Sequence, residues 1–207
     1  MRLSFKLIPL TVVCLFGLTL GAFGQQIQGN YETVGPVPKA HSLDVVRLEE
    51  FLNFTCPHCN NFREVAKPLF AKYGKRLKAT YIPILFRGQS DGPLRLYFIA
   101  ERAGRAEEMK NLIFDATFRY GVDINDPKIV SYLARSAGLA KAYEQEAHAS
   151  WVDGKIKAAV ARANAMGVEA TPTIVLNGAL RLVPSTGMNE FVANLDQVIA
   201  QLLKKQG

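Results

Sequence analysis

The pattern of apolar and polar residues divides the first half of the chain into strands and a helix. Residues 45–54 (VVRLEEFLNF) are rich in β-branched and aromatic residues and predict a strand. From about Cys59 apolar residues recur three and four positions apart, which predicts a helix that Pro68 should kink. Residues 77–86 alternate and predict a second strand. The order here is therefore strand, helix, strand.

The middle of the chain has a helical composition. Residues 93–166 are rich in Ala, Leu, Arg, Glu and Lys and are interrupted by glycines and a proline. Asp126-Pro127 is typical of an N-cap followed by the first helical residue. We expect four or five helices, over residues 93–103, 106–120, 126–137, 140–150 and 152–165.

Strand character returns toward the C-terminus. Residues 173–176 (TIVL) and 180–183 (LRLV) flank Asn177-Gly178, a strong hairpin signal. A closing helix is expected over residues 189–204.

The element order indicates the fold class. A short edge strand is also expected at residues 27–34. Without the helical block the order is βαβ followed by ββα, which is the skeleton of the thioredoxin fold. We therefore predict an α/β protein: a thioredoxin fold with a helical insertion at about residues 92–166, between the βαβ and ββα parts.

The N-terminus has the composition of a secretory signal peptide. Arg2 and Lys6 precede an uncharged, mostly apolar stretch at residues 7–23, and Ala22-Phe23-Gly24 supplies small residues for a signal peptidase. We expect residues 1–24 to be cleaved and the protein to be periplasmic. The alternative is a retained membrane anchor, which needs about 20 apolar residues.

Charge and cysteine content narrow the class of function. Loss of Arg2 and Lys6 lowers the basic count from 25 to 23 against 18 acidic residues, a net charge of +5. The basic residues are scattered, so nucleic acid is not an expected partner. Residues 25–207, the expected mature domain, contain only Cys56 and Cys59 of the three cysteines. In an oxidising compartment, one such close pair indicates redox chemistry rather than a disulfide scaffold.

The motif Cys56-Pro57-His58-Cys59 lies where the predicted strand ends and the helix starts. Free backbone N–H groups and the positive end of the helix stabilise a thiolate there, which lowers the pKa of Cys56. We expect His58 to add to this stabilisation. A stabilised thiolate favours the dithiol and makes the disulfide a stronger oxidant. Cys59 is then the resolving thiol.

Two other interpretations use the same residues. A zinc site needs four ligands, and beyond the motif only His41 and His148 are candidates, so no metal is expected. The second interpretation is a structural disulfide between Cys56 and Cys59, but closing so small a loop would stabilise the fold little.

The segment at residues 50–62 (EFLNFTCPHCNNF) resembles the active-site segment of the DsbA family of periplasmic thiol:disulfide interchange proteins. Residues 168–178 (VEATPTIVLNG) are similar to that family's cis-proline segment. The resemblance covers most of the expected mature chain, including the helical insertion.

The resemblance implies roles for three further residues. Pro172 is expected to be cis and to pair with an extended substrate beside Cys56, an ordinary trans proline being the alternative. Thr171 is placed to tune the disulfide and substrate release. Glu50 matches a buried acid beneath Cys59 that exchanges a proton with this thiol. The alternative for Glu50 is a solvent-facing position at a strand edge.

The resemblance also implies an enzyme that donates its Cys56–Cys59 disulfide to reduced exported clients. Reoxidation by a quinone-linked membrane partner, of the DsbB type or resembling vitamin K epoxide reductase, is expected, with no bound cofactor. Thr171 stands where the best-known members carry valine, so an isomerase or reductase is the alternative. A non-catalytic periplasmic client or metal binder is a further one. Only a short segment precedes the first strand, without room for a dimerisation domain, so we expect a monomer.

Overall fold

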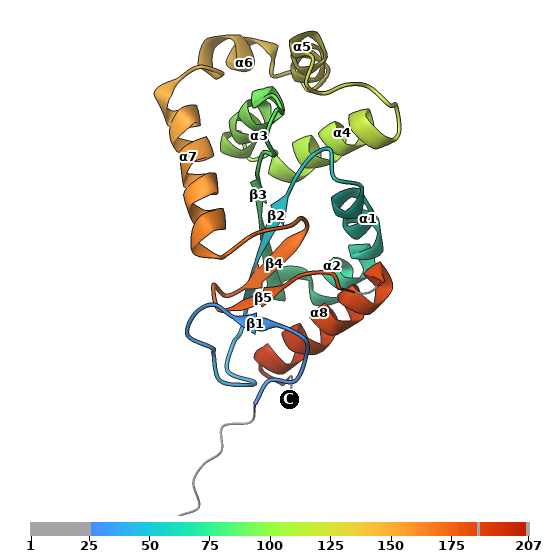
Figure 1. Cartoon of the computed structure of the whole chain (residues 1–207), viewed down its shortest axis with the longest axis vertical. Coiled ribbons are helices and arrows are strands. Elements are labelled where there is room, and N and C mark those ends of the chain that lie inside the picture. Colours follow the sequence, from blue (N-terminus) through green and yellow to red (C-terminus); the bar gives the residue numbers. More distant parts are fainter. Residues whose placement is uncertain (1–25, 186, 206–207) are drawn as a thin grey trace, which may run out of the picture.

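A five-stranded mixed sheet forms the centre of the computed structural model, which describes residues 26–185 and 187–205 (Figure 1). The strands are β1 (Glu32–Thr33), β2 (Val46–Leu52), β3 (Leu77–Pro83), β4 (Thr173–Leu176) and β5 (Leu180–Leu182). Their order is β1-β5-β4-β2-β3, with β2 parallel to β3 and antiparallel to β4. The predicted signal peptide, residues 1–24, lies outside the described residues. None of the helices in the described part of the chain is long and apolar enough to span a bilayer.

The helices form two groups. The helices α1 (Pro57–Val65), α2 (Lys67–Tyr73) and α8 (Met188–Leu202) accompany the sheet, with a short 3-10 turn at Gly74–Arg76. The chain between β3 and β4 forms α3 (Gly92–Arg102), α4 (Ala106–Phe118), α5 (Pro127–Ser136), α6 (Ala140–Glu146) and α7 (Ser150–Ala165). This second group lies at the top of Figure 1, and α7 descends from it beside the sheet. The predicted thioredoxin fold with a helical insertion is confirmed.

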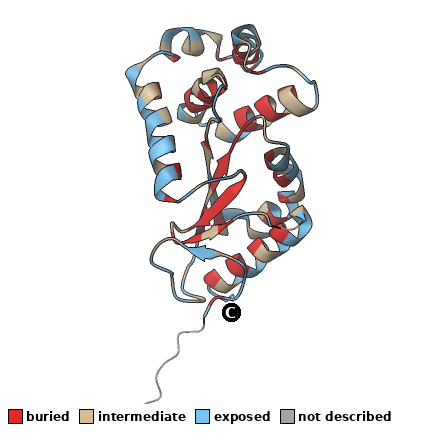
Figure 2. Ribbon diagram, viewed as in Figure 1, coloured by how far each residue is buried: buried red, intermediate tan, exposed pale blue. Residues whose placement is uncertain are grey.

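Strand β2 is covered on both faces over most of its length, and five of its seven residues are buried, the colour that predominates along it in Figure 2. Successive side chains of a strand point to opposite faces. On one face Leu48 packs in a buried cluster with Phe62 of α1 and Leu195 of α8. On the other face Phe51 packs with Ala163 and Met166 of the α7 region. The alternation along β2 therefore sorts its side chains between two different layers of helices.

Several boundaries in the first half differ from the predicted ones, because prolines and side chains change the backbone pairing. The helix starts at Pro57 rather than at Cys59, since proline suits the first helical position. Pro68 does not merely kink the helix: α1 ends at Val65 and Pro68 lies in the first turn of α2. Strand β3 ends at Pro83, and beyond it the N–H of Phe86 binds the Gln89 side chain at 2.8 Å.

The edge strand expected at residues 27–34 is shorter than predicted, since β1 contains only Glu32–Thr33. The N–H of Gln28 donates to the side chain of Gln201 at 2.7 Å, and that of Asn30 to Asn194 at 2.8 Å. Both acceptors belong to α8. These side chains satisfy backbone groups that a strand partner would otherwise bind.

The second half follows the sequence more closely. Asp126 caps α5 through its side chain. Asn177 and Gly178 have φ values of 52° and 68°, the conformation of a tight hairpin turn between β4 and β5. The helix expected over residues 140–150 is shorter than predicted, since α6 ends at Glu146 and α7 follows.

Candidate active site

The cysteine motif forms the first turn of α1, directly after β2. Cys56 is the N-cap of this helix, and its N–H donates to the carbonyl of Asn53 at 3.0 Å. Pro57 and His58 are exposed, Cys56 is half-buried and Cys59 has no exposed surface. Both cysteines are free thiols in the structure. A thiol that a client can reach therefore precedes, by one helical turn, a thiol that it cannot.

The surroundings of Cys56 favour its thiolate. Hydrogen bonding to the Cys59 thiol lowers the pKa of Cys56 to about 5; burial opposes this, and the Thr171 side chain and the backbone N–H groups of Cys59 and His58 assist it. Residue 58 thus contributes through its backbone N–H, and a further contribution from the His58 side chain stays a prediction. A thiolate at a helix N-terminus is a good nucleophile and a good leaving group near neutral pH.

The environment of Cys59 has the opposite effect. Burial raises the pKa of Cys59 far above its usual range, and hydrogen bonding to Cys56 raises it further. In the dithiol, Cys56 therefore carries the negative charge and Cys59 keeps its proton. Any step that frees Cys59 as a thiolate needs a proton donor.

The segment before β4 lies against the cysteine motif, although it is distant in sequence. The Cys56 Sγ is 3.2 Å from the carbonyl oxygen of Thr171, 115 positions along the chain. The Thr171–Pro172 peptide bond is cis, as predicted. The structure thus brings Cys56, Cys59, Thr171 and Pro172 together.

Glu50 is a buried carboxyl on β2, and the alternative of a solvent-facing residue is wrong. Only 2 % of its surface is exposed. Burial raises the pKa of Glu50 to about 7, the charge of Lys110 opposes the rise, and that of Glu107 adds to it. Tyr97 belongs to the buried cluster with Cys59 and also lines the cavity of about 630 Å³ in which Glu50 lies. Proton exchange between Glu50 and Cys59 stays a prediction.

Lys110 of α4 was not found by the sequence analysis. It is 4 % exposed, its Nζ is 3.1 Å from Glu107, and it lies 3.5 Å above the ring centroid of Tyr81. The sequence could have indicated it, because Lys110 lies in α4 between the apolar residues Met109 and Ile113, where a charged side chain is unexpected. A lysine this deeply buried is rare unless it is paired.

A polar network supports the loop before Cys56, and the sequence analysis did not find it either. The Asn53 amide donates to the carbonyl of Ile84 at 2.8 Å and to the Gln89 side chain at 2.7 Å. Its oxygen accepts from the N–H of Thr55 at 2.9 Å, and Gln89 donates to the Thr55 hydroxyl at 2.6 Å. Buried amides that are satisfied in this way hold a backbone in one conformation.

The chemistry available here is thiol–disulfide exchange. In residues 26–185 and 187–205 no three His, Cys, Asp or Glu side chains come together as a metal site. Two thiols of opposite proton affinity, an open face at Pro57 and His58, and a buried acid are the components that such an exchange needs.

Comparison with known proteins gives consistent matches. A family model described as thioredoxin matches residues 44–196. A thiol:disulfide interchange protein DsbA of Burkholderia cepacia is 22% identical over 171 residues, covering 82% of this chain and 80% of that protein. That of Pseudomonas aeruginosa is 25% identical over 174 residues, covering 83% and 82%.

Solved structures share the fold. Oxidoreductase DsbA from Xylella fastidiosa superposes with a TM-score of 0.66 at 23% identity, covering 82% of this chain and 90% of that one. The oxidoreductase NmDsbA1 of N. meningitidis gives 0.64 at 16% identity, covering 87% and 95%. These matches extend over the insertion as well as the sheet.

Proposed function

Because this chain belongs to the thioredoxin family and is a DsbA-like thiol:disulfide oxidoreductase, we propose that it oxidises reduced client proteins through a mixed disulfide at Cys56. The observation that carries this proposal is the opposite shift of the two thiol pKa values, lowered at Cys56 and raised at Cys59. Stabilising the Cys56 thiolate stabilises the dithiol, which makes the disulfide an oxidant.

The first step is attack by a client thiolate on the Sγ of Cys56 in the oxidised enzyme. The Cys56–Cys59 bond breaks and a client–Cys56 disulfide forms. Cys59 leaves as a thiolate in a buried site, where burial favours the protonated form. Glu50, with a pKa of about 7, is our candidate for supplying this proton.

The second step releases the oxidised client. A second client thiolate attacks the client sulfur of the mixed disulfide, the bond to Cys56 breaks, and Cys56 leaves as a thiolate. Its low pKa makes it a good leaving group. The client has then lost two electrons and the cysteine pair has gained them.

A return to the disulfide needs an electron acceptor. The family implies a quinone-linked membrane partner of the DsbB type, or one resembling vitamin K epoxide reductase. We propose that the chain acts in the periplasm as a monomer after loss of residues 1–24, and that it needs no cofactor of its own.

The oxidase direction is preferred over an isomerase or reductase on one observation. The side chain of Thr171 lowers the pKa of Cys56, so this residue stabilises the thiolate rather than the disulfide. A non-catalytic client or metal binder is not favoured, because it does not account for two neighbouring thiols whose pKa values shift in opposite directions.

A Cys59→Ser variant tests the proposal. A client attached to Cys56 then lacks the resolving thiol, so mixed disulfides that disappear on reduction are expected on non-reducing gels of periplasmic extracts. The matched control is Cys56→Ser, which should trap none. If Cys59→Ser trapped no client, the chain would be a binder and the proposal would be wrong.

A further inference from the structure

An open apolar groove lies between α4 and α5 in the helical insertion. It has a volume of about 510 Å³, and none of its lining residues belongs to the cysteine site. Its walls are formed by Leu112, Ala116 and Tyr120 of the α4 region and by Ile129, Tyr132 and Leu133 of α5. Residues three or four apart share one face of a helix. Two neighbouring helices therefore direct apolar faces into one groove.

The two tyrosines of this groove are unusually exposed. Tyr120 is 66% and Tyr132 64% exposed, more than the other exposed large hydrophobic side chains of the described residues. Apolar surface rimmed by polar groups is typical of protein–protein contact sites, and tyrosine is enriched among the residues that dominate binding. The residues of the groove are thus of the kinds that form protein–protein interfaces, and they are exposed in this chain.

Two acidic side chains of α4 near the groove are already paired within the chain. Asp115 of α4 forms an ion pair with Arg63 of α1 at 2.8 Å. Glu108, one turn before Leu112, forms an ion pair with Arg105. Neither carboxylate is left to attract a basic partner.

The basic side chains beside the groove are different. Arg119, Lys128 and Arg135 are exposed, and no acidic side chain of the described residues forms an ion pair with them. Arg119 has its guanidinium carbon 5.5 Å from the ring centroid of Tyr120. These three basic side chains outnumber Asp123 and Asp126 of the connection between α4 and α5, which form no ion pair within the described residues, so the net charge around the groove is positive.

We propose that this groove binds an acidic amphipathic helix of a partner protein. The helix would place its apolar face between Tyr120 and Tyr132 and its carboxylates against Arg119, Lys128 and Arg135. A helix suits the groove better than a membrane surface does, because the apolar residues line a hollow between two helices rather than a projecting edge. This binding is independent of the thiol chemistry and goes beyond the proposed oxidase activity.

The test uses the full mature protein and a fluorescein-labelled synthetic helix, with Leu at alternating spacings of three and four and Glu elsewhere. Fluorescence anisotropy should show saturable binding. The double variant Tyr120→Ser, Tyr132→Ser should weaken it at least about tenfold. The double variant Arg119→Glu, Arg135→Glu should weaken it similarly at low salt and less at high salt.

Matched controls come from exposed residues that do not line the groove. Val160→Ser should leave binding unchanged, and so should the double variant Lys75→Glu, Lys157→Glu, which reverses the same number of charges as the arginine variant. A peptide with Lys in place of Glu should bind more weakly than the acidic one. Circular dichroism verifies that each variant is folded.

Three results would overturn the proposal: no binding of the acidic peptide, equal binding by the wild type and the tyrosine variant, or capture by anionic phospholipid vesicles without peptide binding. The last result would assign the groove to a membrane. Oxidation of a small dithiol peptide should remain at the wild-type rate in the groove variants. Failure of the redox proposal would therefore be recognised separately.

Discussion

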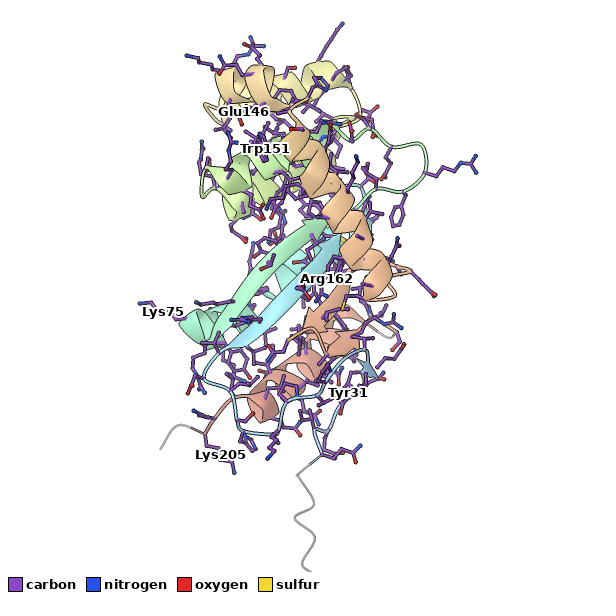
Figure 3. All side chains as sticks on the ribbon, turned by 90° about the vertical axis from the view of Figure 1, so that its left-hand side faces the viewer. Tyr31, Lys75, Glu146, Trp151, Arg162 and Lys205 are labelled. Atoms are coloured by element: carbon purple, nitrogen blue, oxygen red, sulfur yellow. The ribbon has the colours of Figure 1, made fainter. Side chains whose placement is uncertain are left out.

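The two faces of β2 carry carboxylates of neighbouring residues in different environments. Glu49 faces α7, where Arg162 binds it through two hydrogen bonds of 2.9 and 2.6 Å; Figure 3 labels Arg162 on that helix. Glu50 faces the opposite side and is buried near Lys110, with a raised pKa. One face of the strand thus joins the insertion to the sheet, and the other holds a buried acid for which proton transfer is proposed. Strand alternation alone separates the two roles.

The largest expected effect is on catalysis by Glu50→Gln. If Glu50 delivers the proton to Cys59, its loss should slow client oxidation about a hundredfold near pH 7. Stopped-flow oxidation of a dithiol peptide measures this rate. Glu49→Gln is the matched control and should retain the wild-type rate. Equal rates in the two variants would remove Glu50 from the mechanism.

The same substitution should change stability in a pH-dependent way. Below about pH 4.5 the Glu50 carboxyl is protonated in the folded and unfolded chains alike. Between pH 4.5 and about 7 the unfolded chain ionises first, so the wild type loses stability as the pH rises. Glu50→Gln should therefore unfold with a free energy at most about 3 kcal/mol higher than that of the wild type at pH 8, and with the same free energy at pH 4. Urea unfolding at both pH values measures the difference, and a gain independent of pH would contradict the assignment.

Lys110→Met should have a smaller effect on client oxidation than Glu50→Gln. Lys110 lowers the pKa of Glu50, so its removal should raise that pKa by about one unit and move the pH profile of client oxidation upward. The pH dependence of the stopped-flow rate measures this shift. Lys67→Met is the control, because Lys67 lines the same cavity but is mostly exposed. An unmoved profile in Lys110→Met would mean that the lysine only fills space.

Thr171→Val acts on the thiol itself. The Thr171 side chain lowers the pKa of Cys56, so loss of its hydroxyl should raise that pKa and make the disulfide a weaker oxidant, by roughly 15–30 mV. Equilibration with glutathione measures the potential. Thr117→Val, which removes a hydroxyl bound to a helix carbonyl, should leave it unchanged. A more oxidising potential in Thr171→Val would reverse our interpretation of this residue.

Arg162→Met should have the smallest effect. It breaks the ion pair with Glu49, which is partly exposed, so a loss of about 1 kcal/mol or less in unfolding free energy is expected. Client oxidation should be unaffected. The double variant with Glu49→Gln should lose no more than Arg162→Met alone, because both remove one interaction. A clear loss of oxidation rate would show that the two faces are not independent.

The sequence was informative where the signal is local. The motif at Cys56 and Cys59, the Asn177-Gly178 turn and the apolar neighbours of Glu50 each lie within a few residues, so periodicity and turn chemistry find them. Pro172 was placed by resemblance, because no local pattern shows which distant segment lies against a thiol.

The missed features depend on packing between distant elements. Lys110 becomes a partner of Glu50 only because α4 packs near β2 and β3, and Gln89 reaches Thr55 across 34 positions. The bond between Arg162 and Glu49 joins residues 113 positions apart. A single sequence carries no signal for such pairs.

The equilibrium reduction potential of the Cys56–Cys59 pair in glutathione buffers tests the central claim most directly. If the helix N-terminus and Thr171 stabilise the Cys56 thiolate as described, the potential should lie near about −120 mV, the general value for DsbA. A potential at or below about −200 mV would contradict the oxidase account and indicate a reductase or isomerase.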